Sequence, residues 1–286
     1  MNKLNIFSSY IRLPRSVYII FIADIINAAG SFVYPFLTLF LTLKLGYSEN
    51  NAGLLLTIVI AAEGLGRLLG GKLADKIGRK IIVIVLSLAG AVFFVVVAFL
   101  TNSGIIPVLI ILASFLKSGA FPALNAIIID ITNKDNRNDA FSLQYLGHNI
   151  GFAIGPLTAG FLFVNHIRLI FLIDAFATVA ALIPIILFVK DTMPSKTAVE
   201  NKNIDIMERA ESGATLSVFF KRPVLVGYAF ISIVYSFVYA QSTFGLPLYL
   251  GEIFSENGPK IYGSLMTVNA VINFGQHLAL VITQVG

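Results

Sequence analysis

The chain has 286 residues, of which 57% are hydrophobic and only 12% are charged, with a formal net charge of +5. An ordinary soluble domain carries about 25% charged residues, so this composition excludes a typical water-soluble fold. The sequence has no cysteine, which excludes disulfides and thiolate metal sites.

Long apolar segments follow one another along the chain, without the alternation of polar and apolar residues that is typical of β-barrel strands. About 20 successive apolar residues cross the hydrocarbon layer as a helix, which satisfies its own backbone hydrogen bonds there. The sequence therefore predicts an all-α membrane protein. In chain order, the expected spans are residues 17–42, 52–71, 81–101, 105–129, 140–163, 168–189, 223–250 and 261–283.

Lys and Arg are distributed unequally between the two sides of the predicted membrane. The N-terminal tail and the connections 72–80, 130–139 and 190–222 together hold fifteen Lys and Arg, whereas the opposite connections hold three. Cytoplasmic loops carry the excess of Lys and Arg in membrane proteins, so the N-terminus is expected in the cytoplasm. This topology in a lipid bilayer accounts for the net positive charge, and no nucleic-acid partner is expected.

A long polar segment separates six predicted spans from the last two. The sequence YPFLTLFLTLKLGYSENNAGLL around Pro35 is similar to LPLYLGEIFSENGPKIYGSL around Pro247, and such internal repeats are typical of transporters built from two halves. We expect an N-terminal six-helix bundle at 1–189, a cytoplasmic linker at 190–222 and an incomplete C-terminal bundle of two helices at 223–286.

The connection GGKLADKIGRK between the second and third spans resembles motif A of the major facilitator superfamily. Its pattern, G-x-L-x-D-x-x-G-R-[RK], is carried by Gly71, Leu73, Asp75, Gly78, Arg79 and Lys80. The resemblance implies the twelve-helix fold of that superfamily, with this chain ending after the eighth helix. It also implies a conformational latch, in which Arg79 pairs with Asp130 and Asp75 faces the N-terminus of the eleventh helix. A shorter natural form, a split gene and a clipped fragment all remain open.

The fifth span, GHNIGFAIGPLTAG, is similar to motif C of the drug:proton antiporter branch of that superfamily. The matching residues are Gly147, Gly151, Gly155, Pro156 and Gly160. The alternative interpretation is plain helix packing, because small residues four apart let helices approach closely. Residues 125–151 further resemble multidrug antiporters of the LmrP type, in which an acidic residue can occupy the position of Gln144.

Ionisable side chains inside the spans are candidates for proton coupling, because each costs about 2.5–3.5 kcal/mol at mid-helix. We assign Asp24, Glu63 and Arg67 to this group. Asp24 and Arg67 are placed to pair, with a static ion pair as the alternative, and Glu63 shares a helix face with Arg67. The protonation of such carboxylates depends on solvation and on nearby positive charge.

Two further charged residues lie within the spans. Lys117 is expected to act as a counter-ion to Glu63 or to substrate, and a structural role is the alternative. Asp174 has no partner that the sequence reveals, so we expect it to hydrogen-bond locally and reach the outer surface. The superfamily fold implies a cavity lined by the first, fourth and seventh helices. The expected contacts there are Asn27, Tyr34, Lys117, Asn125, Tyr235, Tyr239 and Gln241.

The sequence contains no nucleotide-binding loop of the G-x-x-x-x-G-K-[ST] type and no catalytic constellation. We therefore expect a transporter without enzyme activity, cofactor or metal, driven by a proton gradient. The resemblance favours efflux of lipophilic or cationic drugs by alternating access, in the inner cell membrane and as a monomer in its full-length form. The alternatives are a metabolite or sugar efflux carrier of the same superfamily, and a membrane fragment without independent transport.

Overall fold

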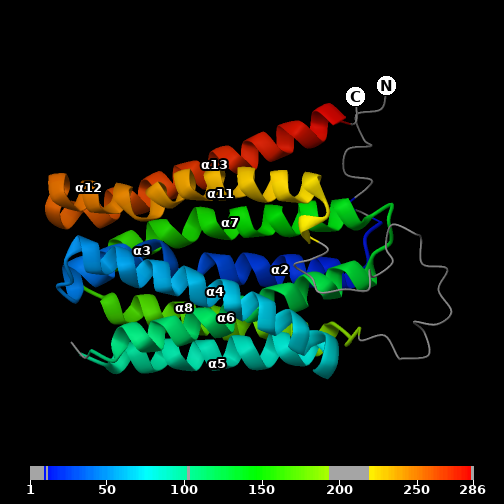
Figure 1. Ribbon diagram of the computed structural model, residues 1–286, viewed down its shortest axis with the longest axis horizontal. Helices are drawn as coiled ribbons and strands as arrows, with labels where there is room; N and C mark the ends of the chain where they lie inside the picture. The colour runs from blue at the N-terminus through cyan, green and yellow to red at the C-terminus, as the bar shows by residue number, and fades with distance from the viewer. Residues whose placement is uncertain (1–9, 11, 102–103, 193–218, 285–286) are drawn as a thin grey trace.

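A computed structural model describes residues 10, 12–101, 104–192 and 219–284, with the backbone alone for 277–284. These residues form helices and turns and include no strand. Seven segments among them are long and apolar enough to cross a membrane, and the helices lie side by side along the long axis of the molecule (Figure 1). The prediction of an all-α membrane fold is confirmed.

The helices correspond closely to the expected spans. In chain order they are α2 (Arg15–Ala29), α3 (Val33–Leu39), α4 (Glu49–Ile77), α5 (Arg79–Phe99), α6 (Ile106–Ile131), α7 (Arg137–Phe163), α8 (Ile167–Phe188), α11 (Pro223–Thr243), α12 (Gly245–Phe254) and α13 (Gly258–Gln284). A π-helical turn, η1 (Phe40–Lys44), extends α3, and a 3-10 turn, η3 (Ser255–Asn257), joins α12 to α13. The first expected span is thus two helices with a break, and the last two fall within one continuous apolar segment, Pro223–Gln276.

The charged connection at 72–80 is shorter than the sequence predicts. Helix α4 continues to Ile77 and α5 begins at Arg79, so the reversal takes place at Gly78 alone. Gly78 has a φ of 129°, a conformation that residues with a Cβ rarely adopt. The charged residues before Gly78 therefore lie on the last turns of a helix that extends beyond the apolar part of its sequence.

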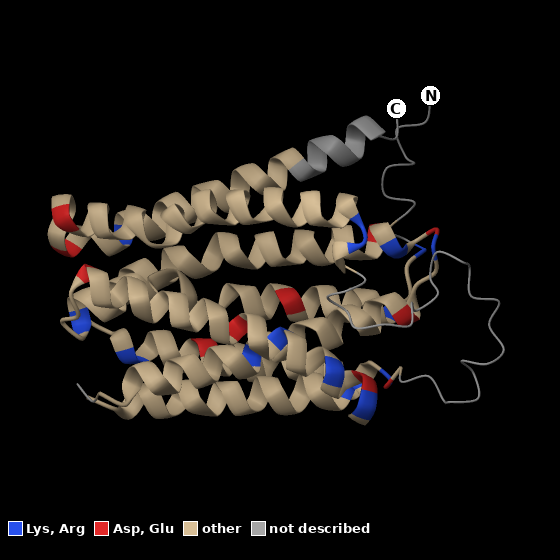
Figure 2. Ribbon diagram, in the orientation of Figure 1, with Lys and Arg blue, Asp and Glu red and all other residues tan. Residues whose placement is uncertain are grey.

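Two clusters of buried apolar side chains form the interior of the helical bundle. One cluster contains Ala91 of α5 and Ile110 of α6, and the other contains Val83 of α5 and Ile127 of α6. Polar side chains occupy the interval between the clusters, as Lys117 does on α6. Figure 2 shows the same arrangement, with charges at the two ends of the helices and a small group midway.

Helices α7 and α13 pack tightly at the end of the molecule that carries the turn η3. A Cβ added to Gly263 would lie 2.2 Å from the carbonyl oxygen of Pro156, and one added to Gly160 would lie 2.7 Å from that of Pro259. Toward its C-terminal end α13 leans away from α7 (Figure 1), and α11 has no buried residue. The bundle is therefore closed at the η3 end and splayed at the opposite end.

Most of the expected linker, residues 193–218, lies outside the described part of the chain, as do the first nine residues. The division into a six-helix bundle, a linker and an incomplete second bundle stays a prediction.

Candidate functional site

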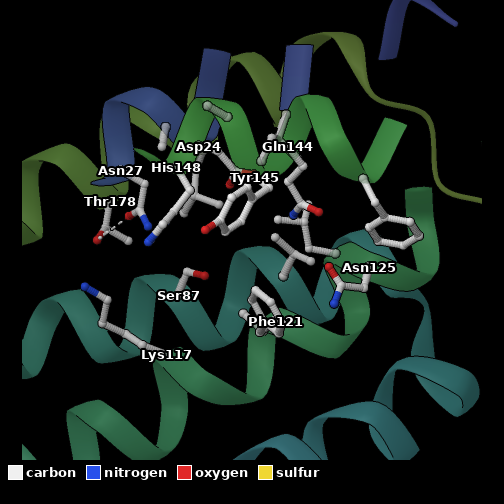
Figure 3. A pocket seen from close by; sticks show the side chains of 18 residues that line it. Asp24, Asn27, Ser87, Lys117, Phe121, Asn125, Gln144, Tyr145, His148 and Thr178 are labelled. Carbon is white, nitrogen blue, oxygen red and sulfur yellow. Dashed lines mark hydrogen bonds between the residues drawn. The ribbon is translucent and has the colours of Figure 1, made fainter. Parts of the chain in front are cut away.

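A cavity of about 490 Å³ adjoins the apolar cluster that contains Val83, with a lining that comes from α2, α5, α6, α7 and α8. Apolar and aromatic side chains such as Leu124, Phe121 and Phe141 form much of the wall (Figure 3). The polar side chains in the lining are those of Asp24, Asn27, Ser87, Lys117, Asn125, Gln144, Tyr145, His148 and Thr178.

The lining differs in part from the expected one. Asn27, Lys117 and Asn125 line the cavity, whereas the remaining expected residues, Tyr34, Tyr235, Tyr239 and Gln241, do not. Helix α11, which has no buried residue, supplies no lining residue, because it does not pack into the bundle at this depth. Among the described residues, this cavity lies within the first six predicted spans.

The tyrosines outside the cavity form a separate group beside it. The rings of Tyr235 and Tyr239 stack with centroids 6.0 Å apart, and Tyr239 lies near Tyr34 and Tyr145. Because Tyr145 also lines the cavity, the tyrosine group adjoins the cavity through that residue.

Asp24 projects from α2 into the cavity. The side-chain amide of Gln144 on α7 lies near its carboxylate, and both residues border the same space in Figure 3. Asp24 takes part in none of the ion pairs found among the described residues. This carboxylate thus faces an apolar cavity with a neutral amide beside it.

The expected pairing of Asp24 with Arg67 is wrong. The Arg67 guanidinium Nη2 instead lies 4.0 Å from Oε2 of Glu63, and the Arg67 side chain is 57% exposed. Neither residue of this pair lines the cavity. Helix α4 packs against α6 through Gly66 and Gly70, where an added Cβ would lie 2.1 and 2.0 Å from α6 carbonyl oxygens. That contact fixes the rotation of α4 and directs Arg67 away from α2.

Lys117 forms an ion pair with Asp174, which crosses from α6 to α8. The ammonium group also lies 4.8 Å from the centroid of the Phe94 ring. Glu63 is therefore not the counter-ion of Lys117. The expectation for Asp174 is wrong as well, because its side chain is 3% exposed and does not reach the surface.

Asp174 also binds the start of α3. Its Oδ2 atom accepts hydrogen bonds from the backbone N–H groups of Phe32, at 3.1 Å, and Val33, at 3.2 Å. One turn later on α8, the Thr178 hydroxyl contacts Oδ1 of Asn27 at 3.3 Å, a bond drawn in Figure 3. The first-turn N–H groups of a helix have no partner within it, so the carboxylate supplies one.

Several lining residues have no strong signal in the sequence. Ser87, Tyr145, His148 and Thr178 are uncharged polar or aromatic side chains inside apolar spans, and such residues are tolerated in membrane helices without a special role. Asp174 did carry a signal, because a buried charge within a span requires a partner. Its partners lie on other helices, which the sequence alone does not identify.

The motif C glycines bring α7 against α2. The backbone oxygens of Phe21, Ile25 and Ala28 would lie 2.9, 2.4 and 2.9 Å from a Cβ added to Gly147, Gly151 and Gly155, respectively. The two helices therefore touch backbone to backbone. Such a contact is what the packing interpretation of the motif requires, and it is also compatible with an antiporter role.

The motif A residues tie the reversal between α4 and α5 to neighbouring helices. Arg79 forms an ion pair with Asp130 at the end of α6, and its Nη1 atom donates to the Ala126 carbonyl at 2.9 Å. Lys80 Nζ donates to the Ile186 carbonyl on α8 at 2.6 Å. The two residues of the expected latch are therefore in contact, whereas Asp75 is exposed.

No group of His, Cys, Asp or Glu in the described part of the chain is arranged to hold a metal ion. The side chains that line the cavity can bind a ligand through a carboxylate, amides and aromatic faces, and the titratable ones among them can exchange protons.

Sequence comparison finds relatives over most of the chain. The chain is 28% identical over 247 residues to the "Uncharacterized MFS-type transporter YqjV" of Bacillus subtilis, covering 85% of this chain and 58% of that protein. It is 27% identical over 216 residues to the class H tetracycline resistance protein of Pasteurella multocida, covering 73% of this chain and 52% of that protein.

Among solved structures, a crystal structure of the peptide transporter POT matches 88% of this chain and 53% of its own chain, with a TM-score of 0.56 and 18% identity. At that identity the match shows the fold alone. The chain thus spans just over half the length of these proteins. The sequence profile of the Major Facilitator Superfamily matches residues 20–284. With the helical fold and motif A in agreement, this chain belongs to the Major Facilitator Superfamily of membrane transporters.

Proposed function

We propose that this protein exports lipophilic cations in exchange for protons, with Asp24 binding the proton and the cation in turn. The observation that carries the proposal is the position of Asp24 in an apolar cavity beside the neutral Gln144 side chain and outside every ion pair of the described residues. On this proposal the N-terminus is cytoplasmic, the membrane is the inner cell membrane, and the proton gradient supplies the energy without a cofactor.

An ionised Asp24 would place a negative charge in an apolar cavity. An ionised carboxylate without a counter-charge is strongly disfavoured in an apolar site, and a proton or a bound cation each removes that penalty. The Gln144 amide lies near Asp24 but brings no charge. The other titratable groups that line the cavity are Lys117, Tyr145 and His148. Lys117 is paired with Asp174. A proton and a cationic substrate would therefore compete for Asp24.

The remaining lining suits a flat, lipophilic cation. Phe121, Phe141 and Tyr145 present aromatic rings to the cavity, and aromatic faces attract cations by about 0.5–2 kcal/mol each. The resemblance of α7 to motif C favours antiport, and one relative is a tetracycline resistance protein. These similarities support drug efflux as the class of transport.

The shape of the bundle favours one particular state of the transport cycle for this structure. Helices α7 and α13 are closed at the η3 end and splayed at the opposite end. The excess of Lys and Arg in the connections at that opposite end favours a cytoplasmic position for it. The structure would then represent the inward-facing state, in which substrate enters from the cytoplasm before the bundles rock. The Arg79–Asp130 pair would stabilise one of the alternating states.

A second candidate is efflux of a sugar or another neutral metabolite. The amide side chains of Asn27, Asn125 and Gln144 line the cavity, and amides are suited to hydrogen bonding with hydroxyl groups. A third candidate is a fragment that binds substrate without moving it, because the chain spans just over half the length of its relatives. The cavity lies within the described helices, so binding can be measured in all three cases.

The test is binding of tetraphenylphosphonium to the purified 286-residue chain in detergent at several pH values. We expect binding at alkaline pH that weakens as the pH falls, because protonation of Asp24 removes the charge that attracts the cation. Asp24→Asn is expected to lower the affinity at least about tenfold at alkaline pH and to abolish the pH dependence. Glu252→Gln, which removes an exposed carboxylate on α12, is the matched control and should behave like the parent.

Retained affinity in Asp24→Asn would contradict the proposal. Binding of a neutral sugar, with no binding of the cation, would favour the metabolite carrier. Ethidium efflux from cells that express the chain, measured with and without a proton uncoupler, separates a working exporter from a fragment that only binds.

A further inference from the structure

The first membrane span is interrupted in the middle of the bundle. Helix α2 ends at Ala29 and α3 begins at Val33, where Gly30 packs so closely on α8 that an added Cβ would lie 2.1 Å from Cβ of Ala177. An unpaired backbone N–H group at a depth where water is scarce is costly. Gly30, Ser31 and Phe32 each donate to a backbone carbonyl of residues 26–30, at 2.8–3.3 Å. Val33, the first residue of α3, needs an acceptor from another helix.

Asp174 is that acceptor, and each of its two oxygens has a separate task. Oδ2 receives the N–H groups of Phe32 and Val33, at 3.1 and 3.2 Å. Oδ1 receives the ammonium group of Lys117. The carboxylate is 97% buried, since only 3% of its side chain is exposed, so a counter-charge is needed for it to remain ionised there.

Asp174 does not line the cavity, but two of its partners, Lys117 and Thr178, do. The Thr178 hydroxyl donates to the backbone carbonyl of Asp174 at 2.9 Å and contacts the cavity residue Asn27 on the last turn of α2. A shift of α3 would therefore move the cavity face of α2 with it.

We propose that Asp174 is a positioning residue that holds the two parts of the interrupted first helix in register by capping α3, and that Lys117 serves as its counter-charge. The hydrogen bonds to the α3 backbone fix the break, whereas the ion pair makes the carboxylate tolerable at that depth. It follows that a neutral acceptor at position 174 can replace the aspartate once the lysine charge is also removed.

The test uses the absence of cysteine from the chain. Ser31→Cys places a single thiol within the break, and its reaction with a membrane-impermeant maleimide reports how often the break opens to water. Two matched double variants are compared in this background. Asp174→Asn with Lys117→Met keeps an acceptor at position 174, and Asp174→Ala with Lys117→Met removes it. Both variants lack the buried charges, so they differ in the acceptor alone.

We expect the Asn/Met variant to label at a rate close to that of the parent and the Ala/Met variant to label roughly tenfold faster. In the Ala/Met variant the Val33 N–H group loses its partner, and the Phe32 N–H group keeps only the Gly30 carbonyl. Asn50→Cys, at an exposed position on α4, is the control and should label equally in all backgrounds. Equal protection of the break in both double variants would overturn the proposal, as would fast labelling in the Asn/Met variant. If the Ala/Met variant does not fold, labelling of the Asn/Met variant close to the parent rate supports the proposal, and fast labelling overturns it.

Discussion

Replacing Gly151 by alanine is expected to separate α7 from α2 and to destabilise the bundle. An added Cβ would lie 2.4 Å from the Ile25 carbonyl oxygen and 2.7 Å from both the Ala28 Cβ and the Ala29 nitrogen. Two of these atoms belong to the backbone, so no side-chain rotation relieves the contacts. Overpacking of this kind costs about 1–3 kcal/mol, and alanine regains about 0.8–1.0 kcal/mol of helix propensity. The expected net loss is therefore up to about 2 kcal/mol.

Gly64→Ala is the matched control, because Gly64 also lies inside a long helix but has no atom within 4 Å of an added Cβ. Without a steric cost, the propensity gain should leave Gly64→Ala at least as stable as the parent. The assay is the loss of the monodisperse gel-filtration peak of detergent-purified protein after heating to successive temperatures. Gly151→Ala should lose this peak at a lower temperature than the parent.

A second change tests the origin of the effect. Ala28→Gly, combined with Gly151→Ala, removes the side-chain contact at 2.7 Å and leaves the Ile25 carbonyl at 2.4 Å. Rescue should therefore be partial. Equal thermal stability of Gly151→Ala and Gly64→Ala would refute the inference that backbone contact between α2 and α7 governs this interface.

Three other substitutions test separate parts of the structure. Gly78→Ala forces a residue with a Cβ to a φ of 129° and should cost about 1–3 kcal/mol, so a melting temperature equal to that of the parent would contradict the single-residue reversal. Asp130→Asn leaves Arg79 with a backbone carbonyl as its partner and should lower transport more than it lowers thermal stability; the opposite order would argue against a latch. Gly263→Ala places a Cβ 2.2 Å from an α7 carbonyl oxygen and should loosen the closed η3 end, measured as faster maleimide labelling of a cysteine at Phe36. An unchanged labelling rate at position 36 would show that α13 can shift relative to α7 without opening the η3 end of the bundle.

The reversal between α4 and α5 shows what a local pattern can predict. Glycine followed by basic residues, between two apolar runs, predicts a sharp turn at the membrane surface, and Gly78 supplies it. The same charges also suggest a longer loop at 72–80. Lys72, Asp75 and Lys76 lie instead on the last turns of α4, and Arg79 and Lys80 begin α5. A helix can continue past the hydrocarbon layer and keep its charged side chains among the headgroups.

The interrupted first helix shows where local patterns fail. The pair Gly30–Ser31 within an apolar run indicates a weak point in the helix. The carboxylate that makes the break stable, Asp174, lies more than 140 positions away in the sequence. A single sequence predicts that a buried charge requires partners, but the identity of those partners depends on helix packing.

Asp24 and Arg67 illustrate the same limit for charge pairs. Both residues are correctly placed within the spans, and both lie at a depth that permits pairing. Pairing also requires the two helix faces to meet, and the rotation of α4 is determined by the contacts of Gly66 and Gly70 with α6. Those contacts depend on shape across two helices, which the residue pattern of either helix alone does not contain.

The balance of charge around the cavity limits what the proposed exporter can exchange. Lys117 and Asp174 neutralise each other, so with His148 uncharged an ionised Asp24 leaves one negative charge at the cavity. One proton or one monovalent cation cancels that charge, whereas a divalent cation would leave an uncompensated positive charge in an apolar site. The proposed mechanism therefore favours monovalent cations over divalent ones. Binding of a bis-quaternary analogue as tightly as tetraphenylphosphonium would show that another acidic group reaches the cavity.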